Sequence, residues 1–68
     1  MNVSRAIERV VQDITKETDY KVIDKFAGVV EEALTEEGIY YRSDDFVTAG
    51  MYGNIVRVAR KVLKDYVK

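Results

Sequence analysis

The chain has 68 residues, with no cysteine and no histidine, and its 11 basic and 12 acidic residues give a net charge of −1. A chain of this length makes one small domain that buries only about 60% of its unfolded surface. Disulfides are excluded, and a zinc or haem site of the usual kind lacks its ligands. We therefore expect no metal and no cofactor, and self-association as the remaining source of added stability.

No apolar run approaches the roughly 18 residues of a membrane span, and no signal peptide precedes the first helical pattern. That first pattern predicts a helix over about residues 3–16, with Asn2 or Ser4 as its cap. Its apolar stripe consists of Val3, Ala6, Ile7, Val10, Val11 and Ile14. The opposite face mixes charges of both signs, and we expect it to be solvated.

The second pattern predicts a helix over about residues 19–37, because Thr18 and Asp19 give an N-cap signal and Gly38 suits a C-cap with positive φ. Its stripe consists of Tyr20, Ile23, Phe26, Ala27, Val30, Ala33 and Leu34. Gly28 costs up to about 1 kcal/mol relative to Ala inside a helix, which suggests a close approach of the first helix or of a partner chain. The acidic end is expected to be solvated or to face basic groups of a neighbour; it contains Glu31, Glu32, Glu36 and Glu37.

A short extended link follows at residues 39–41. We expect its two tyrosines, Tyr40 and Tyr41, to close the end of the helical core, with stacking on nucleic-acid bases as the alternative. Ser43 followed by Asp44 and Asp45 indicates an N-cap with acids in the first turn.

The third predicted helix runs over about residues 44–66, and Phe46, Val47, Met51 and Ile55 continue its apolar pattern. Gly50 and Gly53 weaken its start. They leave open an alternative in which the helix breaks and Asn54 caps a separate fourth helix.

The tail of this helix, residues 54–68, separates its charges from its apolar side chains. It carries five basic residues and one acid, whereas the other 53 residues carry six basic and eleven acidic ones. The basic arc consists of Arg57, Arg60, Lys61, Lys64 and Lys68. A basic helix on an acidic body indicates a class of partner, although lysines on an outer face are also ordinary solvated residues.

The apolar arc of the same tail is wider than the roughly 100° stripe that covers one core. We therefore expect the third helix to be buried on two sides, against its own domain and against a second copy of the chain. The predicted dimer interface consists of Ile55, Val56, Ala59, Val62, Leu63, Tyr66 and Val67, with residues of the second helix joining it.

Met51, Tyr52, Gly53 and Asn54, followed by a basic run, resemble the recognition-helix signature of homeodomains. Met51 stands where that signature has Trp, and two apolar residues replace the two arginines that follow the Asn. Because Asn54 is flanked here by Gly53 and Ile55, we expect it to have a backbone or capping role instead of reading a base.

End to end, the chain resembles the C-terminal, homeodomain-related domain of the membrane-associated DNA-replication organiser of phi-29-like Bacillus phages. The resemblance implies a three-helix, homeodomain-like domain in a helix-swapped or intimately packed homodimer. It also implies DNA binding with little sequence preference, higher multimers on DNA, and a role in viral DNA replication. In that family an N-terminal membrane segment and a coiled coil, neither present in this sequence, attach the protein to the cytoplasmic face of the host cell membrane.

Two functions remain. The first is a single dimerisation and DNA-binding domain that contacts the phosphate backbone of single- or double-stranded DNA. The predicted DNA-binding residues are Tyr52, Asn54, Arg57, Arg60, Lys61, Lys64 and Lys68. The second is a helical protein-interaction or dimerisation module without nucleic-acid binding, which the pI of 5.3 favours. We expect no enzyme activity, because no catalytic combination of residues and no phosphate-binding glycine motif is present.

Overall fold

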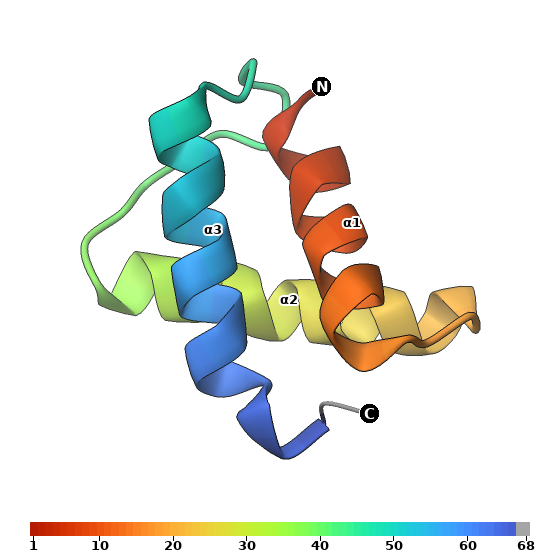
Figure 1. Cartoon of the computed structure of the whole chain (residues 1–68). Helices are drawn as coiled ribbons and strands as arrows, with labels where there is room; N and C mark the ends of the chain where they lie inside the picture. Colours follow the sequence, from red (N-terminus) through yellow and green to blue (C-terminus); the bar gives the residue numbers. More distant parts are fainter. Residues whose placement is uncertain (67–68) are drawn as a thin grey trace.

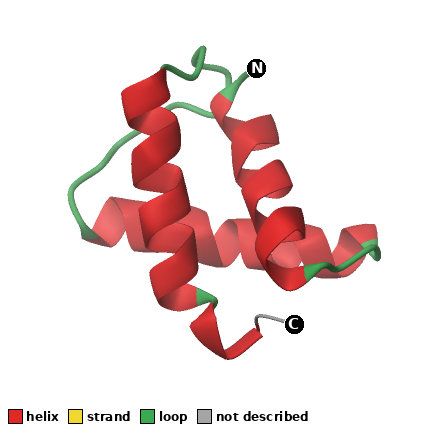
Figure 2. Ribbon diagram, in the orientation of Figure 1, coloured by secondary structure: helices red, strands yellow, loops and turns green. Residues whose placement is uncertain are grey.

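Three helices make up most of the computed structural model, which describes residues 1–66. They are α1 (Val3–Thr15), α2 (Tyr20–Glu36) and α3 (Ala49–Val62), and a 3-10 turn, η1 (Lys64–Tyr66), follows α3. The helices α1 and α3 lie side by side, and both cross α2 (Figure 1). Apart from an isolated bridge between Asn2 and Phe46, the described residues are helix or loop (Figure 2). The predicted all-helical class with three helices is confirmed.

The helix α1 begins and ends close to the predicted bounds. Asn2 caps it, because its Oδ1 accepts a hydrogen bond from the backbone N–H of Arg5 at 2.8 Å. The helix ends when Lys16 adopts a left-handed conformation with φ of 59°, although no glycine marks that position. Thr15 is buried, and its hydroxyl donates to the Val11 carbonyl at 2.8 Å. That bond allows a polar residue to extend the apolar stripe.

The helix α2 matches its prediction at both ends. Asp19 caps the start by accepting from the backbone N–H of Lys21 at 2.9 Å. Gly38, with φ of 81°, follows the C-cap residue Glu37. The first helix does not approach Gly28 closely, as the sequence suggested it could, because a Cβ at that position would meet no atom within 4 Å. Tyr20 was also misplaced, since it is exposed rather than part of the core.

The start of α3 differs from the prediction by five residues. The helix begins at Ala49, because Thr48 caps it and accepts from the backbone N–H of Met51 at 3.2 Å. The helix continues through Gly53 without the alternative break at Asn54. Its last turn tightens into η1, so the regular helix stops at Val62.

Residues 43–47 do not cap α3 because their backbone groups are used at the start of α1. The Val3 N–H donates to the Asp45 carbonyl at 2.9 Å, and the Ser4 N–H donates to the Ser43 carbonyl at 3.0 Å. The first N–H groups of a helix have no partner within the helix, and residues of the connection from α2 to α3 supply partners here. This whole connection, residues 37–48, is called the link from here on. It is longer than the three or four residues of a typical helix-turn-helix turn.

A single core lies where the three helices meet. It consists of Val3, Ala6, Ile7, Val10, Val11, Ile23, Ala27, Val30, Leu34, Ile55, Val58, Ala59 and Leu63. The radius of gyration is 10.8 Å, close to the roughly 11 Å expected for a compact domain of this length. Residues from all three helices of one chain therefore contribute to this core. None of the helices in the described part of the chain is both long and apolar enough to cross a membrane.

Candidate nucleic-acid interface

One side of α3 carries exposed residues along its whole length, and we call it the outer face. It consists of six residues of α3 and the first residue of η1: Ala49, Gly50, Gly53, Arg57, Arg60, Lys61 and Lys64. Its first two turns have almost no side chains, whereas its second half is basic. The spacing puts these residues on one side because they recur at helical intervals opposite the buried Ile55, Val58 and Ala59.

An acidic side chain from α2 contacts the basic half of the outer face. Arg57 Nη1 donates to Glu37 Oε1 at 2.9 Å, and Lys61 Nζ lies 3.7 Å from Glu37 Oε2. The hydrogen bond from Arg57 and the positive charges of Arg57 and Lys61 together lower the pKa of Glu37 below its ordinary value of 4.5, against an opposing effect of burial. The acidic end of the second helix was expected to be solvated or to face basic groups of a neighbour, whereas its C-cap residue Glu37 faces Arg57 and Lys61 of the same chain.

The remaining cations of the outer face are not paired in this way. Arg60 and Lys64 are exposed and make no ion pair within residues 1–66. Arg60 lies in the last turn of α3, and Lys64 is the first residue of η1. Lys68, the fifth predicted cation, lies outside the described residues, as does Val67. All four described cations of the predicted arc are exposed, but two of them contact Glu37 and two make no ion pair within residues 1–66.

Asn54 holds the link against α3. Its Nδ2 donates to the Tyr41 hydroxyl at 2.9 Å in a part-buried position. Asn54 lies within the helix, so it is not a cap, and its role in the chain is a side-chain tie between α3 and the link. Tyr52, another predicted DNA contact, is partly buried and packs against the core. Neither side chain belongs to the exposed outer face.

The predicted dimer interface is divided by the structure. Ile55, Ala59 and Leu63 are completely buried inside one chain, so a partner cannot contact them while this fold is intact. Their burial corrects that part of the prediction. Val56 and Val62 are partly buried, and Tyr66 is 51% exposed.

An apolar surface lies where α2 meets the end of α3, and we call it the apolar shoulder. It consists of Phe26, Val29, Ala33, Val62 and Tyr66. The rings of Phe26 and Tyr66 are 4.7 Å apart between centroids, Val29 is 40% exposed, and Ala33 and Val62 line one shallow pocket. Val29 lies three positions after Phe26 and four before Ala33, so the three residues lie on the same side of α2.

The two aromatic residues on the link were placed wrongly by the sequence. Tyr40 and Phe46 are each 77% exposed, although one was expected to close the core and the other to continue its pattern. Tyr41 does pack against the core. In an extended segment successive side chains point to opposite sides, so the inward position of Tyr41 turns Tyr40 outward.

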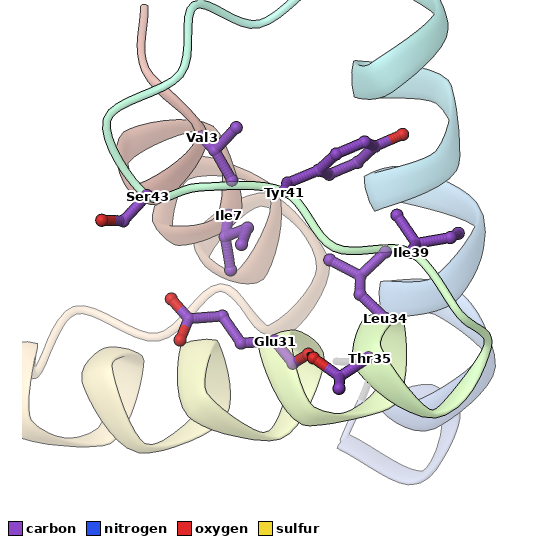
Figure 3. A pocket seen from close by; sticks show the side chains of 8 residues that line it. All are labelled: Val3, Ile7, Glu31, Leu34, Thr35, Ile39, Tyr41 and Ser43. Carbon is purple, nitrogen blue, oxygen red and sulfur yellow. The ribbon is translucent and has the colours of Figure 1, made fainter.

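A separate pocket lies between α1, α2 and the link (Figure 3). Its lining residues are Val3, Ile7, Glu31, Leu34, Thr35, Ile39, Tyr41 and Ser43. The hydroxyls of Thr35 and Tyr41 are already used, in bonds to the Glu31 carbonyl and to Asn54. Within residues 1–66, no group of three potential metal ligands occurs, and no buried side-chain polar atom lacks a hydrogen bond. The pocket therefore gives no indication of chemistry.

The class that the fold and the site define is a small three-helix domain with a basic helix face. No protein-family model, curated protein or solved structure matches the chain.

Proposed function

We propose that this domain is a dimeric DNA-binding module that contacts phosphates and is indifferent to sequence. The observation that carries the proposal is the outer face of α3, an exposed helix surface with four cations and small residues in its first turns. Lysine and arginine side chains neutralise phosphates, and that interaction is independent of the base sequence. The small residues at its start let a phosphate backbone approach the helix closely.

Sequence tolerance follows from what the outer face lacks. Bases are read mainly by side chains that form directed hydrogen bonds, above all Arg, Asn and Gln. The amide of Asn54 donates to Tyr41, and Gly50 and Gly53 contribute no side chain. The arginines are the remaining side chains of the outer face that could read bases, and Arg57 forms an ion pair with Glu37. We therefore assign the first phosphate contacts to Arg60 and Lys64, and later ones to Arg57 and Lys61 as phosphate displaces Glu37.

The apolar shoulder is the surface that we assign to the dimer. It retains two of the predicted interface residues, Val62 and Tyr66, and adds three from α2. Exposed aromatic and aliphatic side chains gathered in one place commonly mark an interaction surface. Because Lys61 lines the same pocket as Ala33 and Val62, a dimer formed there brings two outer faces into one assembly and strengthens the field felt by a polyanion.

A module of the phage DNA-replication organiser type has these properties, and we include that role in the proposal. The organiser acts at the host membrane through another part of its chain, and multimers on DNA would extend the same dimer contact.

A salt titration of DNA binding tests the proposal. The double variant Arg60→Glu with Lys64→Glu should bind every duplex sequence more weakly. The slope of log affinity against log salt should also flatten by roughly 0.9 for each lost phosphate contact. The matched control is Arg5→Glu with Arg9→Glu, which makes the same charge change at the same spacing on α1 and should have a much smaller effect. Equal losses in the two double variants, or no binding by the native chain at low salt, would contradict the proposal.

Sedimentation tests the dimer. Val29→Asp should convert the dimer into folded monomers, because Val29 is exposed in one chain and its replacement leaves the core intact. A native chain that sediments as a monomer at high micromolar concentration would end the dimer proposal. A native dimer that binds no DNA would instead identify the second candidate, a helical dimerisation module, which the apolar shoulder favours.

A further inference from the structure

Tyr40 is an exposed aromatic residue whose two neighbours are fixed. Its side chain is 77% exposed, while the Ile39 N–H donates to the Leu34 carbonyl at 3.0 Å and the Tyr41 hydroxyl accepts from Asn54 at 2.9 Å. Both neighbours pack against the core. The backbone at Tyr40 is therefore held in place, and the ring is presented to solvent at a low cost in ordering.

Tyr40 lies on a segment of the link that contacts one edge of α3 both before and after Tyr40. Three residues before it, Glu37 contacts Arg57 and Lys61, and one residue after it, Tyr41 contacts Asn54. The three α3 residues that receive these contacts are spaced by three and four positions, so they form one edge of the helix. The segment that carries Tyr40 is tied at both ends to this edge, next to two cations of the proposed site.

An exposed ring beside cations is the combination that binds unpaired nucleotides. Bases of a single strand stack on aromatic side chains while a basic surface follows the phosphates, and such stacking tolerates any base. In a duplex the bases are stacked on one another and their faces are unavailable. Stacking on an aromatic ring therefore distinguishes single strands from duplexes, whereas contacts to phosphates do not.

We propose that Tyr40 is a stacking site for an unpaired nucleobase of a single strand whose phosphates lie on Arg57 and Lys61. This inference rests on the proposed function and adds a site for one form of DNA. Tyr52, a predicted DNA-binding residue, is partly buried against the core. Tyr40, for which the sequence left base stacking as the alternative to core packing, is exposed.

Phe46 provides a matched control on the same link. Its ring has the same exposed fraction of 77%, but its backbone pairs with Asn2, and the next residue, Val47, donates to the Met1 carbonyl at 2.9 Å. Phe46 is thus tied to the start of α1 and not to the outer face. Removing either ring deletes a similar exposed apolar surface, and only the removal of Tyr40 should alter single-strand binding.

The experiment compares the affinities of a thymidine oligonucleotide and of a duplex of equal length for the native chain, Tyr40→Ala, Tyr40→Phe and Phe46→Ala. Tyr40→Ala should bind the single strand at least about fivefold more weakly, which corresponds to about 1 kcal/mol for one stacked base. Its duplex affinity should be unchanged. Tyr40→Phe and Phe46→Ala should both bind the single strand as the native chain does, and thermal unfolding should show that all the variants are folded.

NMR supplies an independent readout. The ring protons of Tyr40 should shift upfield when the single strand is added, and those of Phe46 should not. The inference is overturned if Tyr40→Ala binds the single strand as tightly as the native chain, or loses single-strand and duplex affinity equally. Either result leaves the proposed function standing when the native chain binds DNA; absence of native binding to both forms at low salt would reject the proposed function itself.

Discussion

The two faces of α3 have the same helical geometry and opposite surroundings. On the inner face, Ile55, Val58 and Leu63 are completely buried by α1 and α2. On the outer face, the first contact of the basic residues is Glu37, from the same chain. A helical pattern in the sequence therefore separates two faces without showing what each face contacts. Both faces of α3 meet parts of their own domain before any partner.

A charged residue in the inner face should cause the largest loss of stability. Leu63→Asp should place an unpaired charge in the core and lower the free energy of unfolding by several kcal/mol, which is comparable to the whole stability of a domain of this size. Circular dichroism should show an unfolded chain at 25 °C. If the variant is instead a folded monomer with nearly native stability, Leu63 lies in a dimer interface, and the burial within one chain is incorrect.

A substitution at Gly53 tests whether another surface packs on the outer face of α3. Gly53→Ala should raise the free energy of unfolding by up to about 1 kcal/mol, because Ala favours a helix over Gly and its Cβ would meet no atom within 4 Å. Urea denaturation measures the change. Gly38→Ala is the contrasting control: with φ of 81°, it should destabilise by roughly 1–2 kcal/mol. Destabilisation by Gly53→Ala would mean that another surface packs closely on the outer face.

The smallest effect concerns the acid on the outer face. The pKa of Glu37 is lowered in the folded chain, first by its hydrogen bond from Arg57. A lowered folded pKa contributes stability that is present above the ordinary value of 4.5 and is lost as the pH falls through the folded pKa. The free energy of unfolding of the native chain should therefore fall more between about pH 5 and pH 3 than that of Glu37→Gln.

Glu36→Gln is the control for this measurement. The substitution removes the same charge, and Glu36 makes no ion pair within the described residues. Its unfolding should follow the native pH dependence. Identical pH profiles for the native chain and Glu37→Gln would show that the contact with Arg57 does not persist in solution.

The sequence was sufficient where local signals agreed with burial. The caps at Asn2 and Asp19, the glycine that ends α2, and the stripes of α1 and α2 follow from turn chemistry and helical spacing. These features depend on residues only a few positions apart. They place two helices within one residue of their observed bounds.

The sequence failed where a distant segment decides the outcome. Residues 43–45 have the chemistry of a cap, but their carbonyls accept from the first N–H groups of α1, and Thr48 caps α3 instead. Glu37 looks like one of four solvated glutamates until α2 and α3 cross and bring it to Arg57. Tyr40 and Phe46 are apolar by type, and only the path of the link makes them exposed. Such contacts depend on tertiary packing, which local spacing does not contain.

The bonds between the link and the start of α1 have a consequence for the motions of the domain. The first turn of a helix usually frays independently, because its N–H groups are unpaired. Here Val3 and Ser4 donate to carbonyls some forty residues later in the chain, and Val47 donates back to Met1. Opening the first turn of α1 thus requires the link to detach, which releases the segment that leads into α3. The first turn of α1 and residues 43–47 of the link should therefore open and close as one cooperative unit, with slow and similar amide hydrogen exchange at Val3, Ser4 and Val47.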